Sequence, residues 1–76
     1  MTGGGDVLVN RIIMIGTHGQ RDYVEKILSG GCPCLCGPNP EYAGLFSDVQ
    51  RDRIIKNLKE HWLDALHVDV VSEEVE

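Results

Sequence analysis

Three cysteines lie close together in this sequence, at positions 32, 34 and 36. Thiolates bind Zn²⁺ tightly, and three thiolates with one imidazole complete a closed tetrahedral site. Three histidines are available to supply the imidazole: His18, His61 and His67. We expect His18, because the loop after the first predicted helix could fold back over the start of that helix. The predicted structural zinc site is therefore Cys32, Cys34, Cys36 and His18.

The spacing of these cysteines leaves two other interpretations open. Common zinc motifs use Cys-x2-Cys, whereas side chains in an extended Cys-x-Cys-x-Cys run converge poorly, and Pro33 stiffens the chain further. A Cys-x-Cys pair can instead close a strained, readily reduced disulfide, which the third thiol could resolve. The cysteines can also be reduced, partly buried small side chains that do no chemistry.

A glycine-rich turn that contains a histidine, Gly16-Thr17-His18-Gly19, follows a predicted buried strand. We expect this turn to join the strand to a helix, which is where ligands bind in open α/β sheets. Free N–H groups and the helix dipole would favour an anion there, and His18 could move a proton or carry a phosphoryl group. The alternative is that both glycines serve only the tight turn and that His18 is exposed.

The string Ile-Gly-Thr-His-Gly at residues 15–19 resembles the phosphorylated-histidine loop of mannose-type sugar phosphotransferase IIA domains. The resemblance covers this turn and its immediate neighbours. It implies that His18 carries a phosphoryl group. The IIA domains are much longer, with further strand–helix units that this chain lacks.

A third set of polar residues, Glu60, Asp64 and His67, falls at helical spacing on one face of a predicted helix. Carboxylate and imidazole groups spaced in this way could share a divalent metal ion. His61 lies at the border of the apolar side of the same helix, six positions from His67. We favour an ordinary solvated helix face for all of them.

The elements that must position these groups follow from apolar periodicity and capping signals. Two capping boxes, Thr17 with Gln20 and Ser47 with Gln50, each mark the start of a predicted helix. The pattern predicts strand 7–15, helix 18–28, irregular Cys/Gly/Pro-rich loop 30–44, helix 48–66 and strand 68–71, between a flexible lead 1–5 and an acidic tail 72–76. The expected fold is α+β, or minimal α/β, in the order β-α-loop-α-β, with two amphipathic helices on one face of a small sheet.

The segment from Ile12 to Ile15 is apolar on both faces, which is typical of a central strand with neighbours on both sides. Two predicted strands are too few for this, so either a further strand has been missed or another subunit completes the sheet. We expect a homo-oligomer or a subunit of a complex. In the second helix, Trp62 is predicted to be buried with Ile55, Leu58 and Leu66.

Composition limits the functions that are open to the chain. It has 76 residues and a net charge of −5, so we expect a single domain that does not bind nucleic acid directly. No apolar run approaches about 18 residues and the first residues do not resemble a signal peptide, which predicts no membrane span and a cytoplasmic location.

These observations favour a small interaction module that works by protein–protein binding, with the cysteine loop as an exposed or zinc-stapled recognition loop. The alternatives are a small enzyme or phosphoryl carrier that uses His18, or a thiol-redox protein that uses Cys32, Cys34 and Cys36. A chain this short hardly encloses a water-excluded pocket by itself, so an enzyme would also have to be an oligomer.

Overall fold

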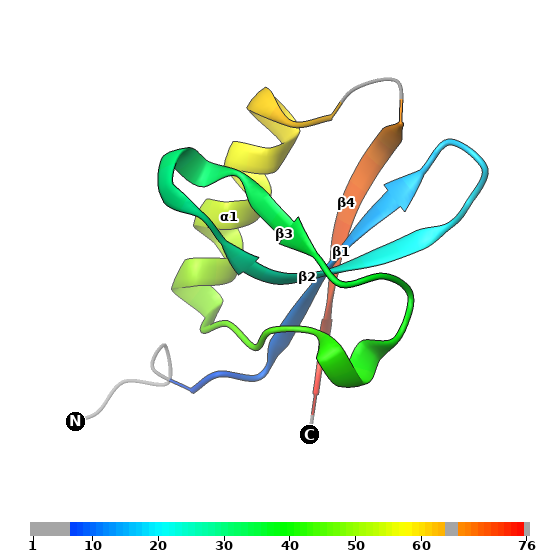
Figure 1. Cartoon of the computed structure of the whole chain (residues 1–76). Helices are drawn as coiled ribbons and strands as arrows, with labels where there is room; N and C mark the ends of the chain where they lie inside the picture. Colours follow the sequence, from blue (N-terminus) through cyan, green and yellow to red (C-terminus); the bar gives the residue numbers. More distant parts are fainter. Residues whose placement is uncertain (1–6, 64–65, 76) are drawn as a thin grey trace.

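The structure is a computed structural model that describes residues 7–63 and 66–75. Four strands form one antiparallel sheet in the order β3-β2-β1-β4, and one helix packs against it (Figure 1). The elements are β1 Asn10–Gly16, β2 Arg21–Ile27, β3 Pro33–Leu35, α1 Asp48–His61 and β4 His67–Glu74, with short 3-10 turns at Ser29–Gly31 and Pro40–Tyr42. The predicted α+β class is confirmed, but the order is β-β-β-α-β with one helix rather than two.

Strand β1 is the central strand, as its two apolar faces predicted. Ile12 and Met14 point toward the helix and join the main core with Leu58. Ile13, on the opposite face, is also fully buried and lies between Tyr23 of β2 and Val71 of β4. The neighbours that β1 requires are therefore supplied by strands of the same chain.

The helix predicted over residues 18–28 is wrong, because residues 21–27 form strand β2. The apolar residues Tyr23, Val24 and Ile27 fit a short helix face as well as a strand. In the sheet, Tyr23 pairs with Ile13 on one face, while Val24 enters the core on the other. A helix of this length gains little by itself, so packing on both faces of an extended strand decides the outcome.

A tight hairpin turn joins β1 to β2 where a helix start was expected. The N–H of Gly16 donates to the carbonyl of Gln20 at 2.8 Å, and that of Gly19 donates to the Gly16 carbonyl at 3.0 Å. Gly19 has a φ of +83°, the left-handed conformation that closes a three-residue hairpin loop. The Gln20 side chain accepts the His18 N–H at 3.0 Å, so the capping-box pattern here stabilises a turn.

The Cys/Gly/Pro-rich segment 30–44, predicted to be irregular, contains the short edge strand β3. Its backbone follows β2: the carbonyl of Cys32 accepts from Leu28 at 2.7 Å and the N–H of Cys36 donates to Tyr23 at 2.9 Å. Alternate residues of an antiparallel strand point their main-chain groups the other way, so those of Pro33 and Leu35 face away from the sheet. Proline is tolerated there because no ladder bond is lost.

The chain then returns to fill the gap where β2 separates from β1. Gly44 donates to the Val24 carbonyl at 3.0 Å, and Phe46 pairs with Asn10 of β1. A Cβ atom at position 44 would overlap the carbonyl oxygen of Glu25. Glycine is therefore required at this position by the close approach of two backbones.

Helix α1 starts as predicted and ends earlier than predicted. Both halves of the Ser47–Gln50 capping box are present, and the helix ends at His61 rather than at residue 66. Leu58 is fully buried, and Ile54, Ile55 and Trp62 pack against the core. Trp62 packs on the predicted core, although it is half-buried like Ile55, whereas Leu66 is 65% exposed, so the prediction that Leu66 is buried is wrong. Ala65 lies outside the described residues.

Strand β4 is longer than the predicted 68–71 and includes much of the expected acidic tail. Ser72, Glu73 and Glu74 pair with the first half of β1. The carboxylate of Glu73 is 2.9 Å from the Arg11 guanidinium, which neutralises one of the clustered acids. The predicted flexible lead 1–5 and the last residue of the tail lie outside the described residues.

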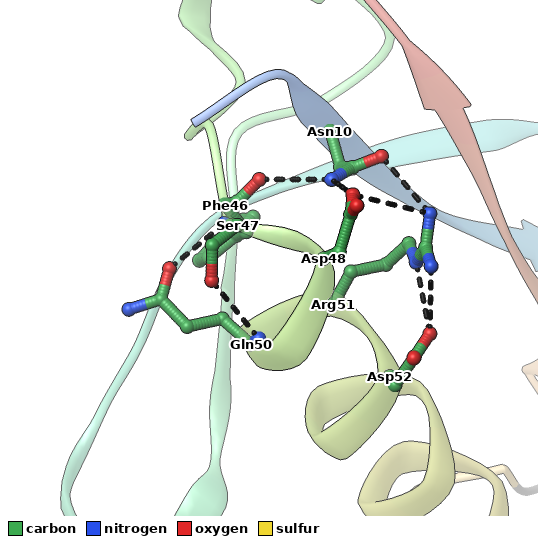
Figure 2. A network of polar contacts seen from close by, with 7 residues as sticks. All are labelled: Asn10, Phe46, Ser47, Asp48, Gln50, Arg51 and Asp52. Carbon is green, nitrogen blue, oxygen red and sulfur yellow. Dashed lines mark hydrogen bonds and ion pairs between the residues drawn. The ribbon is translucent and has the colours of Figure 1, made fainter. Parts of the chain in front are cut away.

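A buried polar network fixes the start of α1 against β1 (Figure 2). The Asn10 side chain, only 1% exposed, donates to the Phe46 carbonyl at 3.0 Å and to Asp48 Oδ1 at 2.8 Å. Its oxygen accepts from Arg51 Nη1 at 3.1 Å. Every polar atom of this amide therefore has a partner, as burial requires.

Candidate functional site

The three cysteines lie along β3 and its ends, and all are free thiols of intermediate exposure. Their surroundings differ. Cys32 Sγ is 3.8 Å from the Pro33 carbonyl oxygen, Cys34 Sγ is 3.8 Å from a carboxylate oxygen of Glu25, and Cys36 Sγ is 3.4 Å from the carbonyl oxygen of Tyr23.

Within residues 7–63 and 66–75, no three histidine, cysteine, aspartate or glutamate side chains are grouped so that they could hold a metal ion. His18, the expected fourth ligand, is exposed in the β1–β2 turn rather than at a helix start. The described residues therefore contain no preformed set of zinc ligands, and zinc binding stays a prediction.

The surroundings of Cys36 disfavour its thiolate. Burial raises the pKa of this thiol, and the negative charge of Glu25 raises it further; Cys34 and Asp22 act in the same direction with smaller effects. Because the thiolate is the form that reacts, the raised pKa makes Cys36 a weaker nucleophile at a given pH than the same thiol in the unfolded chain.

Cys32 borders a small apolar pocket between β3 and the C-terminal end of α1. We call it the Cys32 pocket; its volume is about 170 Å³, and Met14, Pro33, Leu35, Trp62 and Leu66 form its apolar walls beside Cys32 and His67. Met14 is almost fully buried, whereas Leu35 and Leu66 are 37% and 65% exposed at the surface. The pocket thus leads from exposed apolar groups to the core.

The histidine of this pocket is His67, not His18. Its Nε2 is 3.3 Å from Asp22 Oδ2, which orients the ring. The pairing depends on a register shift at Ile15 and Gly16, which places His67 opposite Gly16 at the start of β4. His67 is therefore not on the helix face with Glu60, as the sequence suggested, and Asp64 lies outside the described residues. The contact between Asp22 and His67 could not be predicted from spacing, because 45 positions separate them.

A second concave region lies between β2 and α1. Two adjoining cavities of about 350 and 330 Å³ share Ile27, Arg53 and Ile54. Gly30, Gly31 and Asn57 complete the first, and Lys26, Phe46 and Gln50 complete the second. We call the two together the cationic groove, because Lys26 and Arg53 are its charged residues.

The expected anion site at Gly16-Thr17-His18-Gly19 depended on a helix at its end. The structure has a hairpin there, with β1 followed by β2, so no helix begins at this turn. His18 is exposed at the surface, which matches the alternative in which the glycines serve the turn alone.

No protein-family model, curated protein or solved structure matches this chain. Among the described residues, no helix has the length and apolar character that crossing a bilayer requires.

Proposed function

We propose that this protein is a small interaction module that binds an extended segment of a protein partner at the Cys32 pocket. The observation that carries the proposal is the pocket itself, which leads from exposed Leu35 down to buried Met14. Its volume of about 170 Å³ is below the range of small-molecule sites and suits one large apolar side chain. Such pockets accept the anchor residues of protein partners.

The exposed edge of β3 favours a partner segment that binds in an extended conformation, as an added strand. The main-chain groups of Leu35 face away from β2, and they border the pocket to which the Leu35 side chain contributes. An added strand would exchange hydrogen bonds with this edge while its side chain enters the pocket. Pro33 keeps the edge short, which limits pairing to a few residues.

The charge of the protein favours a basic partner. The net charge is −5, and the carboxylates of Asp22 and Glu25 lie on β2 beside β3. We therefore expect a segment with one leucine, methionine or phenylalanine side chain flanked by lysine or arginine. Such charges increase the rate of encounter more than the final affinity.

Titration with a synthetic peptide tests the proposal. Trp62 is the only tryptophan of the chain and lines the pocket, so its fluorescence reports occupancy. We expect acetylated Lys-Thr-Leu-Thr-Lys to change the emission with a saturable curve. The matched peptide with serine at its centre should bind at least about tenfold more weakly, because burying a leucine side chain contributes roughly 1.5–3 kcal/mol.

Two variants locate the binding site. Leu35→Ser removes an apolar wall and should weaken binding of the leucine peptide by about tenfold. Tyr42→Ser removes an apolar side chain that is more exposed than Leu35 (64% against 37%) and does not line the pocket, and binding should be unchanged. Equal affinity for both peptides, or equal loss in both variants, would contradict the proposal.

A further inference from the structure

The two charged side chains of the cationic groove, Lys26 and Arg53, form no ion pair with any other described residue. The chain has seven lysine and arginine residues. Four of them lie within 4.0 Å of a carboxylate oxygen: Arg11, Arg21, Arg51 and Lys59. The other three, Lys26, Arg53 and Lys56, have no ion pair in the described residues, although acids outnumber bases in the chain by twelve to seven. Of these three, Lys26 and Arg53 line the groove and Lys56 does not.

These two cations lie over an apolar surface. Ile27 and Ile54 line both cavities, and Phe46 lines the second beside Lys26. The side-chain amides of Gln50 and Asn57 lie at the border, one in each cavity. An apolar surface with a few polar groups is the usual composition of a small-molecule site, and each cavity falls within the usual size range for such sites.

We infer that the cationic groove binds a small amphipathic organic carboxylate. The carboxylate would lie between the lysine ammonium and the arginine guanidinium, and its aliphatic or aromatic body would cover Ile27 and Ile54. Arginine suits a carboxylate because its planar fork can donate two parallel hydrogen bonds. An inorganic anion would leave the apolar surface exposed to water, and an uncharged lipid would leave both cations without a partner.

The proposed site is separate from the Cys32 pocket, which shares no lining residue with the groove. Failure of peptide binding at the pocket would therefore leave this inference intact, and the converse is also true. Ligand binding here should not depend on the cysteines.

Octanoate, followed by two-dimensional ¹H–¹⁵N NMR, is the direct test. We expect saturable shifts of the backbone amides of Gly30 and Gly31 and of the side-chain amides of Gln50 and Asn57. Acetate has the charge without the apolar body, and 1-octanol has the body without the charge. Both should bind about tenfold more weakly than octanoate, since each lacks one of the two contributions.

Substitutions then distinguish binding of octanoate in this groove from nonspecific attraction of its carboxylate to any surface lysine or arginine. Lys26→Gln with Arg53→Gln should weaken octanoate binding by about tenfold, while Arg53→Lys alone should cost about threefold or less. Lys56→Gln is the matched control, because Lys56 is on the same helix, is exposed and lines neither cavity. The affinity of the Lys56→Gln variant for octanoate should equal that of the wild-type protein.

Several outcomes would overturn the inference. These are shifts confined to other regions, octanol binding as tightly as octanoate, or an equal loss in the Lys56 variant. The altered side chains are exposed, so the variants should keep the wild-type melting temperature. If the double variant does not fold, the comparison of octanoate with octanol on the wild-type protein still decides the result.

Discussion

The Nδ2 atom of Asn10 donates to Oδ1 of Asp48 at 2.8 Å, and this bond joins the central strand to the first turn of α1 across 38 positions of sequence. The Phe46 carbonyl lies beside it and accepts from the same Asn10 amide (Figure 2), and the backbone of Phe46 also pairs with that of Asn10. One buried amide therefore links the central strand to the segment before the helix and to the first turn of the helix. Buried networks of this kind contribute most when every member is satisfied.

Asn10→Ala should be strongly destabilising, because it removes three side-chain hydrogen bonds to Phe46, Asp48 and Arg51. We expect a loss of about 2–3 kcal/mol in the free energy of unfolding, measured by urea denaturation. Asn39→Ala, which removes one exposed bond to the Glu41 N–H, should cost about 1 kcal/mol or less. Similar losses in the two variants would show that the Asn10 network is not specially important.

Gly44→Ala should disrupt the packing of residues 44–46, which contact β2 through Gly44 and β1 through Phe46. The new methyl group would overlap the Glu25 carbonyl, which is backbone and cannot move aside cheaply. We expect a cost of about 3 kcal/mol by the same urea measurement. Gly19→Asn is the matched control: nothing lies within 4 Å of the added Cβ atom and asparagine tolerates a positive φ, so about 1 kcal/mol or less is expected.

The packing at and beyond the C-terminal end of α1 can be tested by three substitutions to alanine. Leu58→Ala should cost about 3 kcal/mol, because this side chain is fully buried. Trp62→Ala should cost a similar amount, because its large ring packs on the core although it is half-buried. Leu66→Ala should cost about 0.5 kcal/mol or less, because Leu66 is exposed. Thermal unfolding followed by circular dichroism checks all three, and a large loss at Leu66 would mean that this side chain is buried rather than exposed.

Alkylation should show that folding slows the reaction of Cys36. Because burial raises the pKa of Cys36 and the thiolate is the form that reacts, this residue needs a higher pH than Cys36 in the urea-unfolded chain. We expect its reaction with iodoacetamide to be slower in the folded than in the unfolded protein at pH 8. Peptide mass spectrometry reports each site separately, and faster modification of Cys36 in the folded protein would contradict the stated shift.

Chelation tests the zinc hypothesis directly. The described residues hold no group of three suitable donors, so we expect EDTA to leave the melting temperature unchanged. Elemental analysis of protein purified without chelator provides the matched measurement. Stoichiometric zinc together with a lower melting temperature in EDTA would instead mean that Cys32, Cys34 and Cys36 rearrange around an ion, since structural zinc contributes directly to folding.

The sequence by itself determined the features that depend on neighbouring residues along the chain. Ser47 and Gln50 cap α1 because a capping box is completed within one turn of helix. The apolar residues Ile12 to Ile15 predicted a central strand, because a strand with apolar side chains on both faces must be covered on both faces. The start of the helix and the identity of the central strand were therefore predicted correctly.

Tertiary structure decided the features for which the local pattern allowed two outcomes. Residues 21–27 fit a short helix and a strand equally well, and packing on both faces, with Tyr23 beside Ile13 and Val24 in the core, selects the strand. The Cys/Pro-rich run gains its edge strand from β2, which provides the hydrogen-bond partners that the run cannot provide for itself. His67 replaced His18 as the histidine beside a cysteine because β4 returns next to β1 with a shifted register. Contacts between such distant residues form only when the whole sheet assembles, and for that reason no local spacing in the sequence predicted them.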